Sequence, residues 1–295
     1  MRRVAIAGVG NMGGAMTQRL LLDHGWPVQV FDIDPVKMEA LQKLGATARP
    51  DAAQAAIGCG VLVVCVVDAG QTEEVLFGPK GAAAVMRAGQ AVLLCPTIAP
   101  RDVEHFAARL AERGIAVIDA PMSGGPARAR DGTMSLMVAC DDAVYEKQKM
   151  VIEALSSKVF RISGKPGDGA RTKLVNNLLA AINLAGAAEA LAMAGRMGLD
   201  LDRTLQVIEE SSGQSWIGSD RMRRAIRGDY EPRAHVTLLQ KDTRLAVQAA
   251  AAAGFEGPLG GVTRDLFERA AQAGYADLDD ASLFKMLSSA EGGPP

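Results

Sequence analysis

Cysteine and histidine are scarce in this chain of 295 residues, and neither is grouped as metal ligands usually are. The four cysteines lie apart without a C-x-x-C pair, and the three histidines are equally scattered. Three of the cysteines border or lie in apolar runs typical of strands, which favours buried free thiols over metal ligands. We therefore expect no metal, and free thiols that suit a reducing cytoplasm.

An excess of one charge is also missing, since 32 Lys and Arg residues face 34 Asp and Glu residues. Such a balance gives no long-range attraction to nucleic acid or to an anionic membrane. No apolar stretch reaches membrane-spanning length without a charge or a turn residue. The first apolar run is too short and too rich in glycine for a signal peptide. We expect a soluble cytoplasmic protein that is long enough for two domains.

A glycine-rich turn follows the first strand-like run, residues 4–7. A helical pattern comes next, and then a second strand-like run at residues 28–31. In this context a G-x-G-x-x-G pattern predicts a dinucleotide site, because its glycines allow a tight turn, a close approach of the pyrophosphate and close packing of helix on strand. The start of the helix supplies N–H groups for the phosphates. We predict cofactor contacts from Gly8, Gly10, Asn11, Met12 and Gly13.

Asp32 ends the second strand-like run, about 20 residues beyond the turn, where a carboxylate accepts the ribose hydroxyls of a dinucleotide. The alternative is a helix cap, but Asp34 stands directly before Pro35 and fits that role better. A 2′-phosphate would meet the negative charge of Asp32, and no arginine follows at positions 33 or 34. The sequence therefore favours NAD over NADP.

Alternating strands and helices continue through the first half, with strand-like runs at residues 61–67, 91–95, 115–118, 135–139 and 159–162. Repeated β-α units predict a mostly parallel, doubly wound Rossmann-type sheet that binds ligands at the carboxyl ends of its strands. Val67, Asp68 and Thr72 follow one strand end, and Thr97 follows another. Thr97 could contact the cofactor or cap the helix that begins near Pro100, and the spacing leaves both open.

Another strand end carries Ser123, Gly124 and Gly125. A serine before two glycines exposes a hydroxyl and backbone N–H groups, which suit a carboxylate ligand. The same residue types also build ordinary turns. Local chemistry does not separate these two interpretations.

The stretch from Gly164 to Asn177 leads from three glycines into a long helical pattern, and only helical patterns follow it. Lys173 and Asn177 lie four residues apart and so share one face of that helix. A solvated helix lysine is the alternative for Lys173. The pair Asn176-Asn177 is a poor choice inside an otherwise strong helix, which is typical of a functional site.

Four motifs together resemble the β-hydroxyacid dehydrogenase family, which is also known as the 3-hydroxyisobutyrate dehydrogenase-like family. They are the cofactor turn, the segment from Asp119 to Gly125 with Gly132-Thr133, the stretch from Gly164 to Asn177, and Lys241-Asp242. Their order and spacing match over essentially the whole chain. The loops at residues 211–216 and 228–233, together with Asp279-Asp280, look most like those of the L-threonate dehydrogenase branch.

The resemblance implies a role for each motif. Ser123, Gly124 and Gly125 would hold a substrate carboxylate, Lys173 would be the catalytic acid and base, and Asn177 would orient the substrate. By the same resemblance, Lys241, Thr97 and Thr72 would contact the cofactor, as would the loop with Val67 and Asp68. Hydride transfer from an alcohol requires a base for the hydroxyl proton. A lysine with the ordinary pKa of about 10.4 is protonated at neutral pH, so we expect burial to lower the pKa of Lys173.

We therefore expect an NAD-binding Rossmann-type domain at residues 1–163, the catalytic signature and a long interdomain helix at 164–195, and an all-α domain at 196–295. The predicted activity is hydride transfer from a small (C3–C5) hydroxy or polyhydroxy carboxylic acid to NAD, in a homodimer or homotetramer. One alternative is an NADPH-dependent reductase of a short aldehyde acid such as tartronate semialdehyde, succinate semialdehyde or glyoxylate. Another is a non-catalytic dinucleotide-binding protein.

Overall fold

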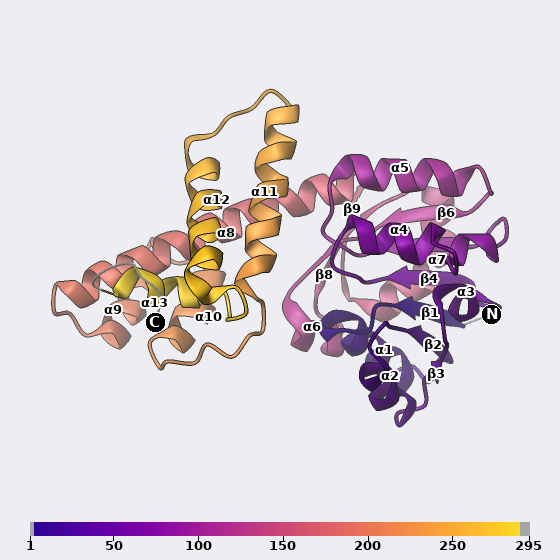
Figure 1. Ribbon diagram of the computed structural model, residues 1–295, viewed down its shortest axis with the longest axis horizontal. Helices are drawn as coiled ribbons and strands as arrows, with labels where there is room; N and C mark the ends of the chain where they lie inside the picture. The colour runs from indigo at the N-terminus through magenta and orange to yellow at the C-terminus, as the bar shows by residue number, and fades with distance from the viewer. Residues whose placement is uncertain (1–2, 290–295) are drawn as a thin grey trace. The chain divides into compact units, whose positions relative to one another are not determined.

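The computed structural model describes residues 3–289, and the chain divides into two compact units. The first unit ends at Lys173 and the second begins at Leu174. The division falls within one long helix, α8 (Asp168–Arg196). Figure 1 shows the strands in the first unit and helices in both units.

The described residues of the first unit form a nine-stranded sheet around a parallel centre. Six strands lie in the order β3-β2-β1-β4-β5-β6 and pair in parallel, which is the doubly wound order of dinucleotide-binding folds. β8 then pairs antiparallel with β6 and β7, and parallel with β9. The strands are β1 (Val4–Ala7), β2 (Val28–Phe31), β3 (Thr47–Ala48), β4 (Val61–Val64), β5 (Ala91–Leu94), β6 (Ala116–Asp119), β7 (Met122–Ser123), β8 (Ser135–Ala139) and β9 (Lys158–Ser163). The predicted fold class is confirmed.

Helices cover both faces of this sheet (Figure 1). Successive side chains of a strand point to opposite faces, so Val4 and Ile6 enter one core while Ala5 and Ala7 enter the other. The first core is completed by α1 (Asn11–Leu22), α2 (Pro35–Gln42), α6 (Gly125–Asp131) and α7 (Asp142–Leu155). The second is completed by α3 (Ala52–Ala56), α4 (Ala69–Phe77), the 3-10 turn η1 (Ala82–Ala84) and α5 (Pro100–Ala111).

Two strands end at other residues than the sequence predicted. β4 ends at Val64, so Val67 and Asp68 lie in the loop before α4 rather than in the strand. β6 extends to Asp119, which makes that carboxylate the last residue of a strand. β3 and β7 were not anticipated, because two-residue strands are too short to show an alternating pattern.

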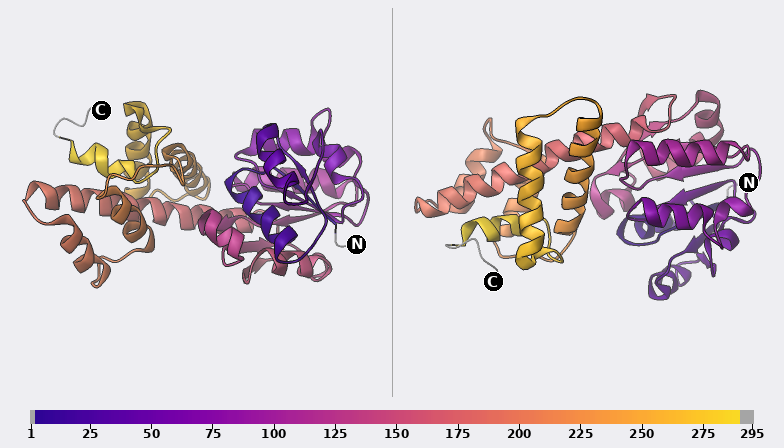
Figure 2. Two further views of the ribbon diagram at one scale, coloured as in Figure 1. Left: turned by 90° about the horizontal axis from the view of Figure 1, so that it is seen from below. Right: turned by 45° about the horizontal axis from the view of Figure 1, so that its top comes forward.

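The second unit is helical, as predicted. Its elements are the rest of α8 with α9 (Leu201–Glu209), α10 (Trp216–Ala225), α11 (Val236–Ala252), α12 (Pro258–Ala270), the π-helical turn η2 (Ala271–Tyr275) and α13 (Ser282–Ser288). Leu184 and Leu191 of α8 are fully buried and pack in one core with Phe267, Tyr275 and Leu283. Figure 2 shows α11 and α12 running side by side.

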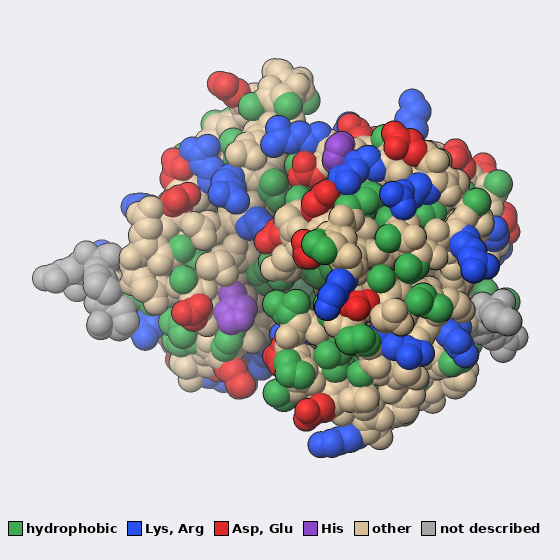
Figure 3. Space-filling model, turned by 45° about the vertical axis from the view of Figure 1, so that its right-hand side comes forward, with side chains coloured by type: hydrophobic (Ala, Val, Ile, Leu, Met, Phe, Trp, Pro, Cys, Tyr) green, Lys and Arg blue, Asp and Glu red, His purple; other side chains and the backbone are tan. Residues whose placement is uncertain are grey.

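Among the described residues, only α8 is long and apolar enough to cross a membrane, with a mean hydropathy of 1.6 over its most apolar stretch. Of that stretch 39% is buried inside the structure. A core helix of a helical domain has the same length and composition, so this is weak evidence for a membrane span. On the face drawn in Figure 3, cationic and anionic side chains are interspersed, as the balanced composition leads one to expect.

Candidate active site

Two glycines of the turn between β1 and α1, Gly8 and Gly13, lie close against neighbouring backbone atoms. Gly8 has a φ of +88°, and a Cβ there would lie 2.6 Å from the carbonyl oxygen of Cys65. A Cβ on Gly13 would lie 1.9 Å from the carbonyl oxygen of Gly8, so only glycine lets α1 start this close to the strand. By contrast, a Cβ on Gly10 would meet no atom within 4 Å. The fold requires Gly8 and Gly13, whereas Gly10 leaves open space for a ligand.

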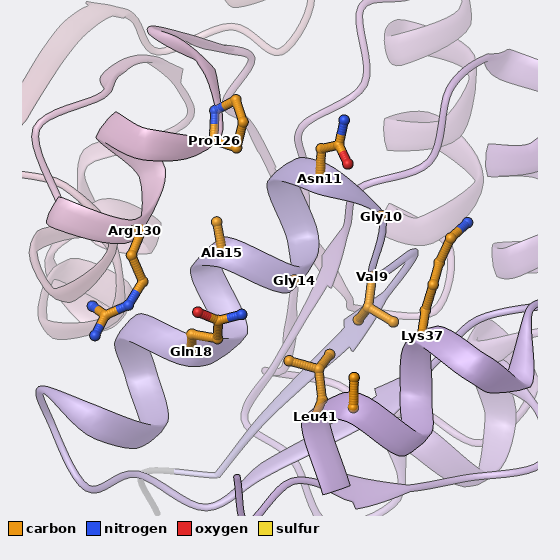
Figure 4. A pocket seen from close by; sticks show the side chains of 11 residues that line it. Val9, Gly10, Asn11, Gly14, Ala15, Gln18, Lys37, Leu41, Pro126 and Arg130 are labelled. Carbon is orange, nitrogen blue, oxygen red and sulfur yellow. The ribbon is translucent and has the colours of Figure 1, made fainter. Parts of the chain in front are cut away.

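The start of α1 fits an anionic group such as a pyrophosphate. Gly10 is the N-cap, without a side-chain hydrogen bond to the helix, and the first turn carries no acid. The N–H groups of a first turn have no partner within the helix and attract anions. A pocket of about 420 Å³ adjoins this helix start at Gly10 and Asn11. Figure 4 shows Lys37 of α2 and Arg130 of α6 on its two flanks.

Asp32 links the end of β2 to the turn. Its Oδ2 accepts a hydrogen bond of 2.7 Å from the N–H of Val9, and its Oδ1 accepts one of 2.9 Å from the N–H of Asp34. Asp34 caps α2 by accepting from the N–H of Val36 at 3.0 Å, with Pro35 in the first turn. The sequence had assigned the cap to Asp34 in this way. Carboxylate oxygens accept more than one hydrogen bond each, so Asp32 keeps capacity for ribose hydroxyls.

The loop before α4 uses its polar groups locally. Asp68 caps α4 by accepting from the N–H of Gln71 at 2.8 Å. The Thr72 hydroxyl donates to the carbonyl of Asp68 at 2.7 Å, and the Thr72 side chain is fully buried. The N–H of Val67 donates to the side chain of Gln71 at 3.1 Å. Cofactor contacts by Val67, Asp68 and Thr72 therefore stay predictions.

Thr97 does not lie at the N-cap of α5, because the N-cap of that helix is Ala99. A cofactor contact by Thr97 stays a prediction.

The segment with Ser123 combines a strand end with a turn. Ser123 lies in β7 and pairs with Ser135 of β8. Gly124 and Gly125 have φ values of +129° and +74°, a region that residues with a side chain rarely adopt. These glycines serve the backbone conformation, and all three residues are partly exposed. A turn of this kind presents its N–H groups to a ligand, so the two interpretations from the sequence are compatible.

Lys173 and Asn177 are buried near the start of α8. Their exposed fractions are only 7% and 8%, which excludes a solvated helix lysine. The Asn177 amide donates to Oδ2 of Asp242 at 2.5 Å and accepts from the Asn176 amide at 3.0 Å. The Lys241 ammonium lies 3.2 Å from Oδ1 of Asp242. Asp242 thus joins Asn177 to the late motif of the sequence.

Two buried carboxylates at the candidate site were not singled out from the sequence. One is Asp242, and the other is Asp119 at the end of β6. Oδ2 of Asp119 accepts from the N–H groups of Gly167 at 2.8 Å and Ala170 at 3.0 Å. Burial raises the pKa of Asp119 to about 6, against backbone hydrogen bonds from Ala170, Gly167 and Gly169 that lower it. The one feature of the sequence that could have pointed to these acids is their place in two of the family motifs, where Ser123 and Lys241 were the residues given a role.

The pair Asp279-Asp280 near the C-terminus serves the helical core. Asp280 Oδ1 lies 2.5 Å from Arg221 Nε, and Asp279 Oδ1 lies 2.8 Å from Arg224 Nη2. Both carboxylates are almost fully buried. They connect α10 to the segment before α13.

Trp216 is the first residue of α10, after the cap formed by Ser215, and half of its surface is exposed.

Within residues 3–289, no group of three His, Cys, Asp or Glu side chains is placed to hold a metal ion.

Known proteins match this chain over nearly its whole length. Residues 3–164 match the family described as the NAD binding domain of 6-phosphogluconate dehydrogenase. Residues 167–287 match the family described as NAD-binding of NADP-dependent 3-hydroxyisobutyrate dehydrogenase. L-threonate dehydrogenase of Cupriavidus necator is 35% identical over 290 residues, which cover 98% of this chain and 97% of the relative. L-threonate dehydrogenase of Escherichia coli O6:H1 is 37% identical over 287 residues, 97% of this chain and 94% of the relative.

Solved structures also resemble this chain over most of its length. The crystal structure of 3-hydroxyisobutyrate dehydrogenase from Salmonella typhimurium superposes with a TM-score of 0.90 at 36% identity, covering 97% of this chain and 100% of that one. Two family matches in sequence, full-length relatives and a shared fold converge on one assignment. The chain belongs to the β-hydroxyacid dehydrogenase family and is an oxidoreductase of hydroxy acids.

Proposed function

We propose that the protein is an NAD-dependent dehydrogenase of a small (C3–C5) hydroxy or polyhydroxy carboxylic acid, similar to L-threonate or 3-hydroxyisobutyrate. The observation that carries the proposal is the burial of Lys173 and Asn177 one turn apart on α8, with Asn177 fixed by Asp242. A buried lysine and carboxamide suit proton transfer and orientation at an alcohol better than a role at the surface.

In the proposed reaction each polar group has one task. The Ser123 hydroxyl and the N–H groups of Gly124 and Gly125 bind the substrate carboxylate. The neutral Nζ of Lys173 accepts the hydroxyl proton as the carbinol C–H bond breaks and a carbonyl forms. The acceptor for the hydride would be NAD, when it is bound. In the reverse direction the Lys173 ammonium returns the proton to the oxygen, and the second N–H of Asn177 orients that oxygen.

NAD is proposed because Asp32 directly follows β2 and its carboxylate is hydrogen-bonded to the turn, as expected of a ribose-binding acid. Thr97 and Lys241 complete the proposed cofactor contacts. The second candidate is an NADPH-dependent reductase of a short aldehyde acid. Lys37, which lines the pocket beside Gly10 and Asn11, is the observation in its favour, because a cation there could offset a 2′-phosphate.

Initial rates with a panel of C3 to C5 hydroxy acids, each with NAD and with NADP, test the proposed function. We expect the highest kcat/KM for an acid that carries a hydroxyl one or two carbons from its carboxylate, with NAD. A higher rate of aldehyde-acid reduction with NADPH would favour the second candidate. Cofactor binding without turnover of any acid or aldehyde would favour a non-catalytic dinucleotide-binding protein.

We also propose that a second copy of the chain covers α8, giving a homodimer or a larger homo-oligomer. Leu179 and Met193 are 58% and 59% exposed, and with Gly186 between them they recur every seven residues on one helix face. This is the spacing at which two helices pair. Exposed apolar side chains on one face of a core helix indicate a partner.

Light scattering after gel filtration tests this proposal. We expect a wild-type mass that is a multiple of 30.9 kDa, and a lower mass for Leu179→Glu. Val207→Glu, at an exposed apolar position of α9, is the control and should keep the wild-type mass. A wild-type mass of 30.9 kDa at micromolar concentration would contradict the proposal.

A further inference from the structure

We propose that Asp119 is a positioning residue that sets the place of Lys173 by capping the start of α8. The inference rests on the proposed function, because it gives Lys173 the proton transfer. It adds a residue to which neither the sequence motifs nor the family assignment gives a task.

The hydrogen bonds of Asp119 reach the helix start from far away in the sequence. Its Oδ2 accepts from the N–H groups of Gly167 and Ala170, which lie 48 and 51 residues further on. The first N–H groups of a helix have no partner within it, so an acceptor fixed elsewhere in the fold determines where the helix begins. Asp119 is fixed in this way, because it is the last residue of β6 and pairs with Ala139 of β8.

The packing around Asp119 leaves little freedom. The residue is 1% exposed. A Cβ on Gly169 would lie 2.9 Å from the carboxylate carbon of Asp119 and 2.7 Å from the carbonyl oxygen of Met137. Gly167 has a φ of +104°, which bends the chain toward the carboxylate. Glycines at these positions let the backbone of the helix start approach one buried acid.

Lys173 follows the anchored residues within one helical turn. It lies three residues after Ala170 and four after Gly169, a rise of about 6 Å at 1.5 Å per residue. Helical side chains lean toward the N-terminus, so the Lys173 side chain leans toward the anchored turn. A shift of that turn therefore moves the amine by a similar amount.

Asp119 also begins the segment that reaches Ser123 four residues later. One carboxylate thus connects two parts of the proposed site, the carboxylate-binding turn and the helix that carries Lys173. In this arrangement the acid need not touch the substrate. It fixes the distance between the groups that do.

Single and double variants of the full-length protein test this inference. Asp119→Ala removes the acceptor, and we expect kcat to fall by about 10- to 100-fold, the loss that a misplacement of about 1 Å produces. Asp119→Asn keeps one oxygen that can accept both N–H bonds, so it should recover most of that loss. The dissociation constant of NAD should stay within about threefold, because the turn at Gly8 to Gly13 is untouched.

The decisive measurement repeats Asp119→Ala in a Lys173→Met background. If Asp119 acts through Lys173, its loss has almost no further effect on the residual kcat there. Fully multiplicative losses, or an unchanged kcat in the single variant, would overturn the inference while leaving the role of Lys173 intact. An unchanged kcat in Lys173→Met itself would instead refute the proposed catalytic role.

Two further variants serve as a control and as a substitute for Asp119→Ala. Asp168→Ala removes a different carboxylate from the first turn of α8, one that pairs with Ser163 and Arg171, and should leave kcat within about threefold. If Asp119→Ala does not fold, Gly169→Ala takes its place, because its Cβ pushes the helix start away from an intact Asp119. The same non-additivity with Lys173→Met is expected, and full multiplicativity there contradicts the inference as well.

Discussion

Replacing Lys173 by methionine should lower kcat about 10³- to 10⁴-fold with every acid that the protein oxidises. A positioned acid-base group contributes up to about four orders of magnitude, and methionine fills the volume without an amine. Lys173 is 7% exposed, so an isosteric apolar residue avoids the cavity that alanine would leave. The dissociation constant of NAD should change by less than about threefold, because the amine acts on the substrate hydroxyl. Single-turnover formation of NADH separates this chemical step from product release.

The matched control is Lys165→Met, an exposed lysine in the loop that precedes the same helix. It should keep kcat within about twofold, because exposed lysines contribute little to stability or to chemistry. A second check uses Lys173→Ala with added small primary amines. If the amine is the base, activity should return in proportion to the concentration of the free amine. Full activity of Lys173→Met would show that another group accepts the proton.

The local parts of the site were predictable from sequence, because each depends on neighbouring residues. Gly8 and Gly13 have backbone roles that a short motif encodes, and the structure assigns each of them the predicted constraint. The helix cap at Asp34 could also be inferred, since a proline after Asp34 marks a helix start. Strand-like apolar runs predicted the central strands, and helical patterns predicted the second half, because both signals are local.

The parts that were missed depend on contacts between distant residues. Asp119 meets Gly167 across 48 residues, and Asn177 meets Asp242 across 65. No periodicity or local motif encodes such a pair, and a buried acid resembles any other acid in a sequence. The burial of Lys173 was expected from the family resemblance and not from a local pattern, because it depends on tertiary packing that helix propensity does not specify.

The second large effect is expected at Asp32. Asp32→Arg should lower the ratio of kcat/KM with NAD to kcat/KM with NADP by on the order of 100-fold. The substitution removes a charged acceptor for the ribose hydroxyls and replaces repulsion of a 2′-phosphate by attraction. Two unit charges 4 Å apart interact by about 4 kcal/mol near a protein surface, and salt screening leaves only part of it. Initial rates with both cofactors at fixed ionic strength measure the ratio.

Asp32→Asn separates the effect of charge from that of geometry. The two oxygens of Asp32 hold the N–H groups of Val9 and Asp34, and asparagine keeps an acceptor for only one of them. We expect this variant to lie between wild type and arginine in cofactor preference. Asp34→Asn is the matched control, because it removes the same charge two residues away while its amide oxygen can still cap α2. It should shift the ratio by less than about threefold, since the Asp34 side chain is 40% exposed and salt screens its charge. If Asp32→Arg shifts the ratio no more than Asp34→Asn does, Asp32 does not bind the ribose, and its contacts with the turn are structural only.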